Sequence, residues 1–158
     1  MRIRALTSAD ATAIAAWRYA GAYSTYDVTD PSDLATGHWA VTEEGELVGY
    51  CCFGAPARVA GAEPEAGTLD IGYGMRPELM GRGRGSRFVG AIVAFALQRD
   101  PRRLRLYVLE WNDRSRSVAA AHGFVVESAV PGDGARFLVM VRPAHDDAQG
   151  ASGSGRVH

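Results

Sequence analysis

A glycine-rich turn between a predicted strand and a predicted helix constrains the fold of this chain more than any other feature. Thr68–Met75 predicts a strand, residues 80–85 read MGRGRG, and residues 86–99 predict a helix with Phe88 and Ile92 on one apolar face. Glycines at such a turn let backbone amides approach an anion closely, and the dipole of the following helix favours negative charge there. The turn has no Gly-Lys-Ser/Thr of a P-loop and fits no register of GxGxxG, so it predicts another kind of anion site.

The rest of the sequence alternates between short strands and helices. Thr7 and Asp10 have the spacing of a capping box that begins a helix, and Asn112 or Asp113 caps a later helix that Gly123 ends. The other predicted strands cover residues 3–6, 38–42, 46–53, 104–108, 125–130 and 136–142. This pattern predicts a domain of the α/β (α+β) class.

One domain is expected, because 158 residues with 47% apolar residues are enough to bury one continuous core. It is predicted to span residues 1–143. The segment 144–158 loses apolar residues and gains Gly, Ser and Asp, so it is predicted to be a disordered tail. No apolar run reaches the roughly 18 residues of a spanning helix, and the first residues have no apolar signal-peptide stretch, so we expect a soluble, cytoplasmic protein without a membrane partner.

The two cysteines, Cys51 and Cys52, are adjacent and point to opposite faces of a strand. Neither a disulfide framework nor a metal pattern fits them, so we expect packing residues and no metal.

Charge is distributed unevenly along the chain. Residues 19–57 carry a local net charge of −6, whereas residues 76–116 contain ten Arg and carry +6. The second stretch favours a polyanionic ligand, for which nucleic acid is the usual first interpretation.

Two motifs in the expected order resemble the GNAT superfamily of N-acetyltransferases. Met75-Arg76-Pro77 and residues 80–85 resemble its cofactor strand and loop, although Met80 stands where the family has Gln or Arg. The segment 106–124, LYVLEWNDRSRSVAAAHGF, resembles its strand, Asn, short helix and Gly-Phe, with a spacing closest to the RimJ/RimL-type branch. The resemblance implies a mixed, mostly antiparallel sheet of about seven strands, splayed at its centre and flanked by about four helices.

The resemblance also implies acetyl-coenzyme A as cosubstrate, which explains the basic stretch without nucleic acid. Backbone amides near the turn would bind its pyrophosphate, while the end of the preceding strand would pair with its pantetheine arm. The implied contact residues are Met75, Arg76, Gly81, Arg82, Gly83, Arg84, Gly85, Ser86, Asn112 and Ser115.

The catalytic residues are less defined by the sequence. Asp70, on the strand before the turn, is the candidate general base, and its alternative is a carboxylate paired with an Arg. Many members protonate the leaving thiolate with a Tyr four residues before Gly-Phe, but Ala119 stands there. Ser115 is the candidate acid, with a cofactor contact as its favoured role; a thiol with a pKa of about 8.5 also leaves without an obligatory donor.

The acceptor is predicted to be a primary amine of a small molecule or a peptide N-terminus. Tyr23, Tyr26 and Asp27 suit a cationic amine through ring faces and a carboxylate, although such residues are also common in cores and caps. The rival reading is a catalytically silent acyl-coenzyme A-binding sensor or scaffold, motivated by Met80 and Ala119. Either a monomer or a homodimer is compatible with the sequence.

Overall fold

The computed structural model describes residues 1–99 and 102–144. The predicted disordered tail therefore lies outside the described residues, apart from Ala144. None of the helices in the described part of the chain has the combined length and apolar character of a membrane span.

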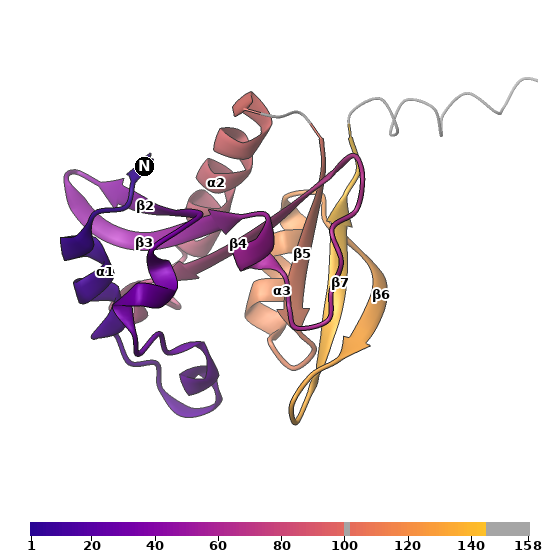
Figure 1. Cartoon of the computed structure of the whole chain (residues 1–158), viewed down its shortest axis with the longest axis horizontal. Coiled ribbons are helices and arrows are strands. Elements are labelled where there is room, and N and C mark those ends of the chain that lie inside the picture. The colour runs from indigo at the N-terminus through magenta and orange to yellow at the C-terminus, as the bar shows by residue number, and fades with distance from the viewer. Residues whose placement is uncertain (100–101, 145–158) are drawn as a thin grey trace, which may run out of the picture.

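A seven-stranded sheet in the order β1-β2-β3-β4-β5-β7-β6 organises the chain (Figure 1). Its strands are β1 (Arg2–Ala5), β2 (His38–Glu43), β3 (Glu46–Phe53), β4 (Thr68–Met75), β5 (Arg103–Leu109), β6 (Val125–Pro131) and β7 (Arg136–Arg142). The pair β4–β5 is parallel and the other pairs are antiparallel. This confirms the predicted mixed, mostly antiparallel sheet.

Three α-helices and four short 3₁₀ helices connect these strands within the described residues. The α-helices are α1 (Ser8–Ala15), α2 (Gly85–Arg99) and α3 (Asp113–Ala121). The 3₁₀ helices are η1 (Gly21–Tyr26), η2 (Pro31–Leu34), η3 (Ala55–Ala57) and η4 (Pro77–Leu79). The Thr7–Asp10 capping box is present at α1, with Asp10 N–H donating to the Thr7 hydroxyl at 3.1 Å.

The two faces of the sheet have separate cores because side chains alternate along each strand. The larger core lies under α2 and α3, where Phe88 and Ile92 of α2 pack with Ile71 of β4 and Leu104 of β5. The smaller core lies under α1 and η2, with Ile14 and Leu34 packed against Leu47 and Tyr50 of β3. Helices α2 and α3 therefore cover one face of the sheet, and α1 and η2 cover the other face.

The sheet splits at its centre. β4 and β5 pair only from Thr68 to Ile71 on β4, although β4 continues to Met75 and β5 continues to Leu109. Figure 1 shows β5, β7 and β6 diverging from the β1–β4 half. The split leaves one edge of β4 without a neighbouring strand.

Candidate functional site

A cavity of about 470 Å³ occupies the split between β4 and β5. Its lining includes seven of the residues predicted to contact a cofactor: Met75, Gly81, Gly83, Gly85, Ser86, Asn112 and Ser115. Segments far apart in the sequence thus meet at one hollow.

The end of β4 presents unpaired backbone groups to this cavity. Arg76 N–H donates to the Val48 carbonyl at 2.9 Å, which makes Met75 and Gly49 a pair without direct hydrogen bonds between them. The N–H and C=O groups of Met75, and of Tyr73 two residues earlier, consequently point away from β3 and toward the gap. Tyr19 already donates its hydroxyl to the Met75 carbonyl at 2.6 Å, so of the two Met75 groups the N–H is left for a ligand. An extended amide-containing molecule can add here as a strand would.

The glycine-rich turn forms the next part of the wall. Gly81 and Gly83 have φ values of 76° and 74°, a left-handed conformation that glycine adopts without steric cost. The first intrahelical bond at this end of α2 joins Phe88 N–H to the Arg84 carbonyl at 3.0 Å, so the amides before Phe88 are the free N-terminal donors of the helix. The His122 ring holds the first turn of α2, since its Nε2 lies 2.8 Å from the Ser86 carbonyl and 3.1 Å from the Ser86 hydroxyl. The turn therefore offers a fixed set of amides to an anion.

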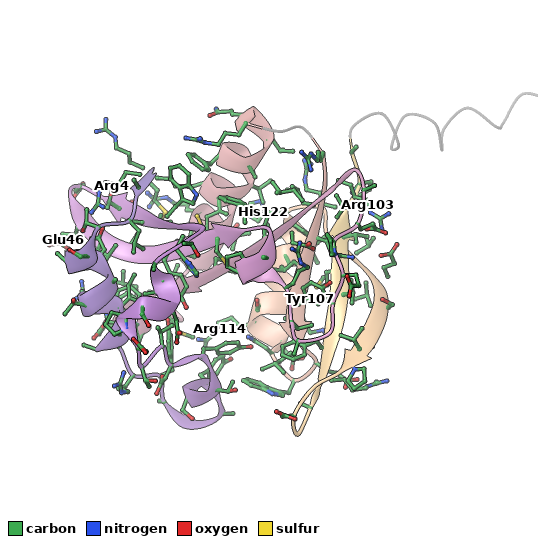
Figure 2. All side chains as sticks on the ribbon, viewed as in Figure 1. Arg4, Glu46, Arg103, Tyr107, Arg114 and His122 are labelled. Carbon is green, nitrogen blue, oxygen red and sulfur yellow. The ribbon has the colours of Figure 1, made fainter. Side chains whose placement is uncertain are left out.

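Helix α3 closes the same side through Asn112 and Arg114. Asn112 is buried; its side-chain oxygen accepts from Ser115 N–H at 3.1 Å as the helix cap, and its amide donates to the Tyr26 hydroxyl at 2.9 Å. The Arg114 guanidinium lies 5.5 Å from the centre of the Tyr23 ring and 3.6 Å from the place a Cβ of Gly81 would occupy. Figure 2 shows Arg114 in the opening between η1 and α3. A positive charge thus stands beside the amides of the turn.

Three arginines predicted to contact the cofactor lie outside the cavity lining. Arg76 pairs with Glu78 at 3.1 Å, Arg84 lies 3.8 Å from Glu43, and Arg82 is exposed. Their contact with a cofactor stays a prediction.

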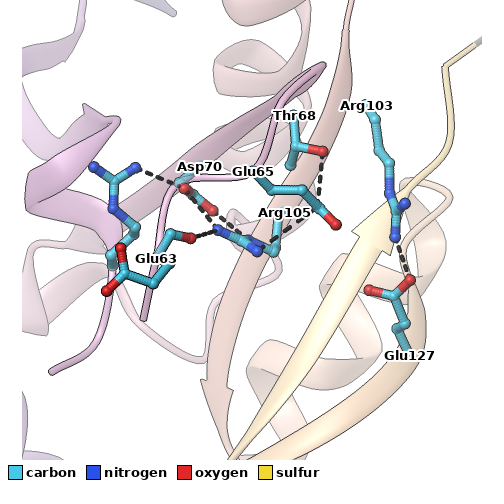
Figure 3. A network of polar contacts seen from close by, with 8 residues as sticks. Glu63, Glu65, Thr68, Asp70, Arg103, Arg105 and Glu127 are labelled. Carbon is cyan, nitrogen blue, oxygen red and sulfur yellow. Dashed lines mark hydrogen bonds and ion pairs between the residues drawn. The ribbon is translucent and has the colours of Figure 1, made fainter. Parts of the chain in front are cut away.

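Asp70 lies in an ion-pair network and outside the cavity lining (Figure 3). Its side chain is 1% exposed; Oδ1 accepts from Arg105 Nε at 2.6 Å, and Oδ2 accepts from Arg58 at 2.9 Å and Arg105 at 3.1 Å. Asp70 is thus paired with arginines, which is the second of the two roles that the sequence allowed for it. The base role stays a prediction, with both carboxylate oxygens occupied in the structure.

Tyr73 has a buried hydroxyl on the face of β4 opposite to that of Asp70. Its oxygen makes no hydrogen bond to any described residue, and burial raises the pKa of the phenol to about 12. The Ser115 hydroxyl is close enough to oppose that shift in pKa, although the two groups do not reach hydrogen-bond geometry. Ala119 is fully buried in the core against which the Tyr73 ring packs. Tyr73 and Ser115 are therefore the hydroxyl groups available on this side.

The predicted acceptor residues separate into two groups. Tyr23 and Tyr26 line the cavity, where both rings lie near Trp111 at 5.3 and 6.1 Å between centres. Asp27 does not line it; its carboxylate accepts from the Tyr19 backbone N–H at 2.8 Å. Asp27 thus fixes the chain before η1, and its binding role stays a prediction.

The sequence matches a known family over most of its length. A model described as the acetyltransferase (GNAT) family matches residues 7–124. The chain belongs to this GNAT family. A search of curated proteins found no match.

Solved structures of other GNAT proteins share the fold. Aminoglycoside acetyltransferase AAC(6')-Ib, in complex with coenzyme A and kanamycin, is 19% identical with a TM-score of 0.74, over 95% of this chain and 98% of that one. A spermidine N-acetyltransferase SpeG chimera from Vibrio cholerae and hSSAT is 14% identical with a TM-score of 0.72, over 92% and 96%. The putative acetyltransferase yncA from Salmonella typhimurium, with acetyl-CoA, is 19% identical with a TM-score of 0.67, over 92% and 94%. At these identities the likeness shows the fold alone, and the RimJ/RimL-type branch stays a prediction.

Several cavity residues of this GNAT protein were not identified from the sequence, among them Tyr50, Tyr73, Tyr107 and Arg114. Strand alternation places Tyr73 on the same face as Met75, and the β4–β5 register places Tyr107 on the same face as Gly72. Alternation along β4 was the available signal for Tyr73, whereas the place of Tyr107 depends on the strand register. Arg114 adjoins Asn112 in a motif already singled out, but its approach to the Gly81 turn depends on tertiary packing. Among the described residues, no group of three His, Cys, Asp or Glu side chains is placed to hold a metal ion.

Proposed function

We propose that this protein transfers acetyl from acetyl-coenzyme A to a primary amine of a small molecule or peptide. The observation that carries the proposal is the unpaired edge of β4, which runs directly into the glycine-rich turn along one cavity. A strand edge for the pantetheine amides and helix-terminal amides for the pyrophosphate are the two features that this elongated anionic molecule requires. The GNAT family membership and the coenzyme A named with several neighbours support the same cosubstrate.

Different parts of the cavity bind different parts of acetyl-coenzyme A. Amides of Gly81, Gly83, Gly85 and Ser86 hold the pyrophosphate with Arg114 beside them, and Met75 N–H orients the acyl end. The acetyl-coenzyme A thioester supplies an activated carbonyl carbon, and Met75 N–H is placed to stabilise negative charge on its oxygen. Asn112 and Ser115 fix the start of α3 against the same ligand.

The two faces of β4 separate the attacking amine from the leaving sulfur. Gly72 and Gly74 face the side of Tyr50 and Tyr107, whereas Tyr73 faces the side of Ser115. The amine nitrogen bonds to the carbonyl carbon from the first side, the C–S bond breaks, and the amine releases one proton to solvent or, as predicted from the sequence, to Asp70. On the second side Tyr73 or Ser115 returns a proton to the thiolate.

The test is thiol release from acetyl-coenzyme A by the purified protein, with pooled monoamines, polyamines, aminoglycosides, amino acids and peptides as acceptors. Calorimetry with acetyl-coenzyme A is run in parallel. Pool-dependent thiol release together with a new acetyl-amine detected by mass spectrometry establishes the activity. Cofactor binding with no transfer to any pool favours the sensor or scaffold instead, and absence of binding contradicts both.

A further inference from the structure

All six tyrosines of the chain line one cavity. They are Tyr19, Tyr23, Tyr26, Tyr50, Tyr73 and Tyr107, and they come from η1, the segment before it and three different strands. Tyr73 lies on the sulfur side, Tyr50 and Tyr107 lie on the face of β4 from which the amine approaches, and Tyr19, Tyr23 and Tyr26 line the cavity from the chain before β2. Such a concentration of rings predicts an apolar, ring-shaped occupant.

The floor of this acceptor region is closely packed. A Cβ on Gly74 would lie 2.5 Å from the Tyr50 ring, so that ring rests directly on the strand. A Cβ on Gly72 would lie 3.0 Å from the Cys52 sulfur and 3.5 Å from the Ala57 side chain. The T-shaped contact of Tyr19 with Tyr26, at 6.5 Å between centres, forms another part of the wall. A planar group fits between such rings better than a branched, heavily hydrated one.

Carboxylates are missing from this wall. Among the described residues that line the cavity, none is Asp or Glu, and Arg114 is the charged one. Asp70 and Asp27 both lie outside the lining; Asp70 is paired with Arg58 and Arg105, and Asp27 accepts a hydrogen bond from the Tyr19 backbone N–H. The phenols also stay neutral, since burial raises the pKa of Tyr50 to about 12 and that of Tyr26 above its ordinary value.

We propose that the acceptor is an arylalkyl monoamine, an aromatic ring joined to one primary amine by a short apolar chain. This rests on the proposed function and names its substrate class. A polyamine or aminoglycoside would place several ammonium groups in a cavity whose lining holds no carboxylate to compensate them, which is costly in a desolvated site. A single ammonium is accommodated by tyrosine ring faces until it loses its proton. The neighbours named for kanamycin and spermidine thus share the fold and differ in acceptor.

The proposal is tested by calorimetric titration of the coenzyme A-saturated protein with phenethylamine, tyramine, spermidine and kanamycin. Phenethylamine and tyramine are expected to bind at least about tenfold more tightly than either polycation. Equal affinity, the reverse order, or no binding of either arylalkylamine overturns the proposal. The titration does not depend on turnover, so acetyl transfer to some other amine would retain the proposed function while this substrate class fails.

Tyr107 offers a matched pair of variants, because it faces the cavity from β5 (Figure 2). Tyr107→Leu removes the ring and should weaken phenethylamine binding about tenfold, whereas Tyr107→Phe keeps the ring and should bind within about twofold of wild type. Phe137→Leu, on β7 away from the cavity lining, is the control for loss of a ring elsewhere.

Coenzyme A affinity measured on each variant confirms that the cavity is still assembled. If Tyr107→Leu fails this check, Tyr23→Leu in η1 replaces it with the same expectation. Unchanged phenethylamine affinity in the leucine variant that retains coenzyme A binding contradicts the proposal.

Discussion

Arg105 holds Asp70 through two hydrogen bonds, from Nε to Oδ1 at 2.6 Å and from Nη2 to Oδ2 at 3.1 Å. The two residues are register partners on the parallel strands β4 and β5, at the last paired stretch before the split. Arg58 supplies a third bond, and the Asp70 side chain is 1% exposed. The ion pair therefore fixes the point from which the two halves of the sheet diverge.

Replacing Asp70 with Asn should mainly lower stability. The change removes the buried carboxylate that Arg58 and Arg105 share and leaves Arg105 only the more distant Glu65, so the free energy of unfolding should fall by about 3 kcal/mol. Urea denaturation measures it, and Glu78→Gln, which removes the exposed partner of Arg76, is the control with a loss under about 0.5 kcal/mol. Unchanged stability with a selective loss of turnover below the pKa of the acceptor amine would instead identify Asp70 as the base.

Replacing Gly83 with Val should abolish coenzyme A binding while the fold persists. Gly83 has φ 74°, and a β-branched side chain there both strains the backbone and crowds the amides of the turn. Gly134→Val is a matched control, since Gly134 has φ 75° in the β6–β7 turn and an equally open surrounding. Both variants should lose about 1 to 2 kcal/mol of stability, but calorimetry should show an affinity loss above about tenfold in Gly83→Val alone. Equal coenzyme A affinity in both variants would contradict the role of the turn.

Replacing Tyr73 with Phe should reduce turnover without reducing stability. The hydroxyl has no hydrogen-bond partner among the described residues, so removing it relieves a buried polar group. If Tyr73 protonates the thiolate, kcat should fall about 100-fold while the KM for acetyl-coenzyme A stays constant.

Ser115→Ala tests the other hydroxyl, and a higher cofactor KM with constant kcat would indicate a contact role. Ser117→Ala, at an exposed position of the same helix, is its control.

The sequence predicted the parts of the site that depend on local backbone chemistry. The glycine turn, the β4 strand and a cap at Asn112 or Asp113 all follow from residue types at short spacing, and the structure contains each of them, with Asn112 as the cap. The pairing of Asp70 with Arg105 could not be derived, because it joins residues 35 positions apart through a strand register. The place of Tyr50 in the cavity lining could not be predicted either, because it depends on the register that pairs Tyr50 with Gly74 on the neighbouring strand.

The protein's two thiols should not react in the folded state. Cys51 and Cys52 are buried and free, and burial raises the pKa of each to about 12, so the thiolate is scarce at pH 8. A chromogenic disulfide reagent should therefore titrate no thiol in the native protein and two thiols per chain in denaturant. Rapid native reaction would show that β3 opens, and would require correction of every thiol-release assay.

Acid should remove a defined part of the stability at Asp10. The hydrogen bonds from Arg4, at 2.6 and 3.1 Å, are the largest cause lowering the pKa of Asp10 from 3.8 to about 2. As the pH falls, Asp10 therefore takes up a proton in the unfolded chain before it does so in the folded protein. The stability that ionised Asp10 contributes is complete above about pH 4 and is lost as the pH falls through 2.

Asp10→Asn tests this acid dependence directly. Because Arg4 is 41% exposed, Asp10→Asn should cost about 1 kcal/mol at pH 6 and less near pH 2, as measured by urea denaturation. Asp133→Asn, at an exposed turn, is the control. A cost that does not change with pH would contradict the assignment.

The bond from the Tyr19 hydroxyl to the Met75 carbonyl has a consequence for self-association. An unpaired strand edge is a template on which a foreign segment can form intermolecular sheet, the first step of aggregation. By occupying one carbonyl of that edge, Tyr19 and the chain that leads into η1 screen it from other polypeptides. The protein can therefore keep half a strand unpaired for a small ligand without exposing it to β-sheet extension by its own copies.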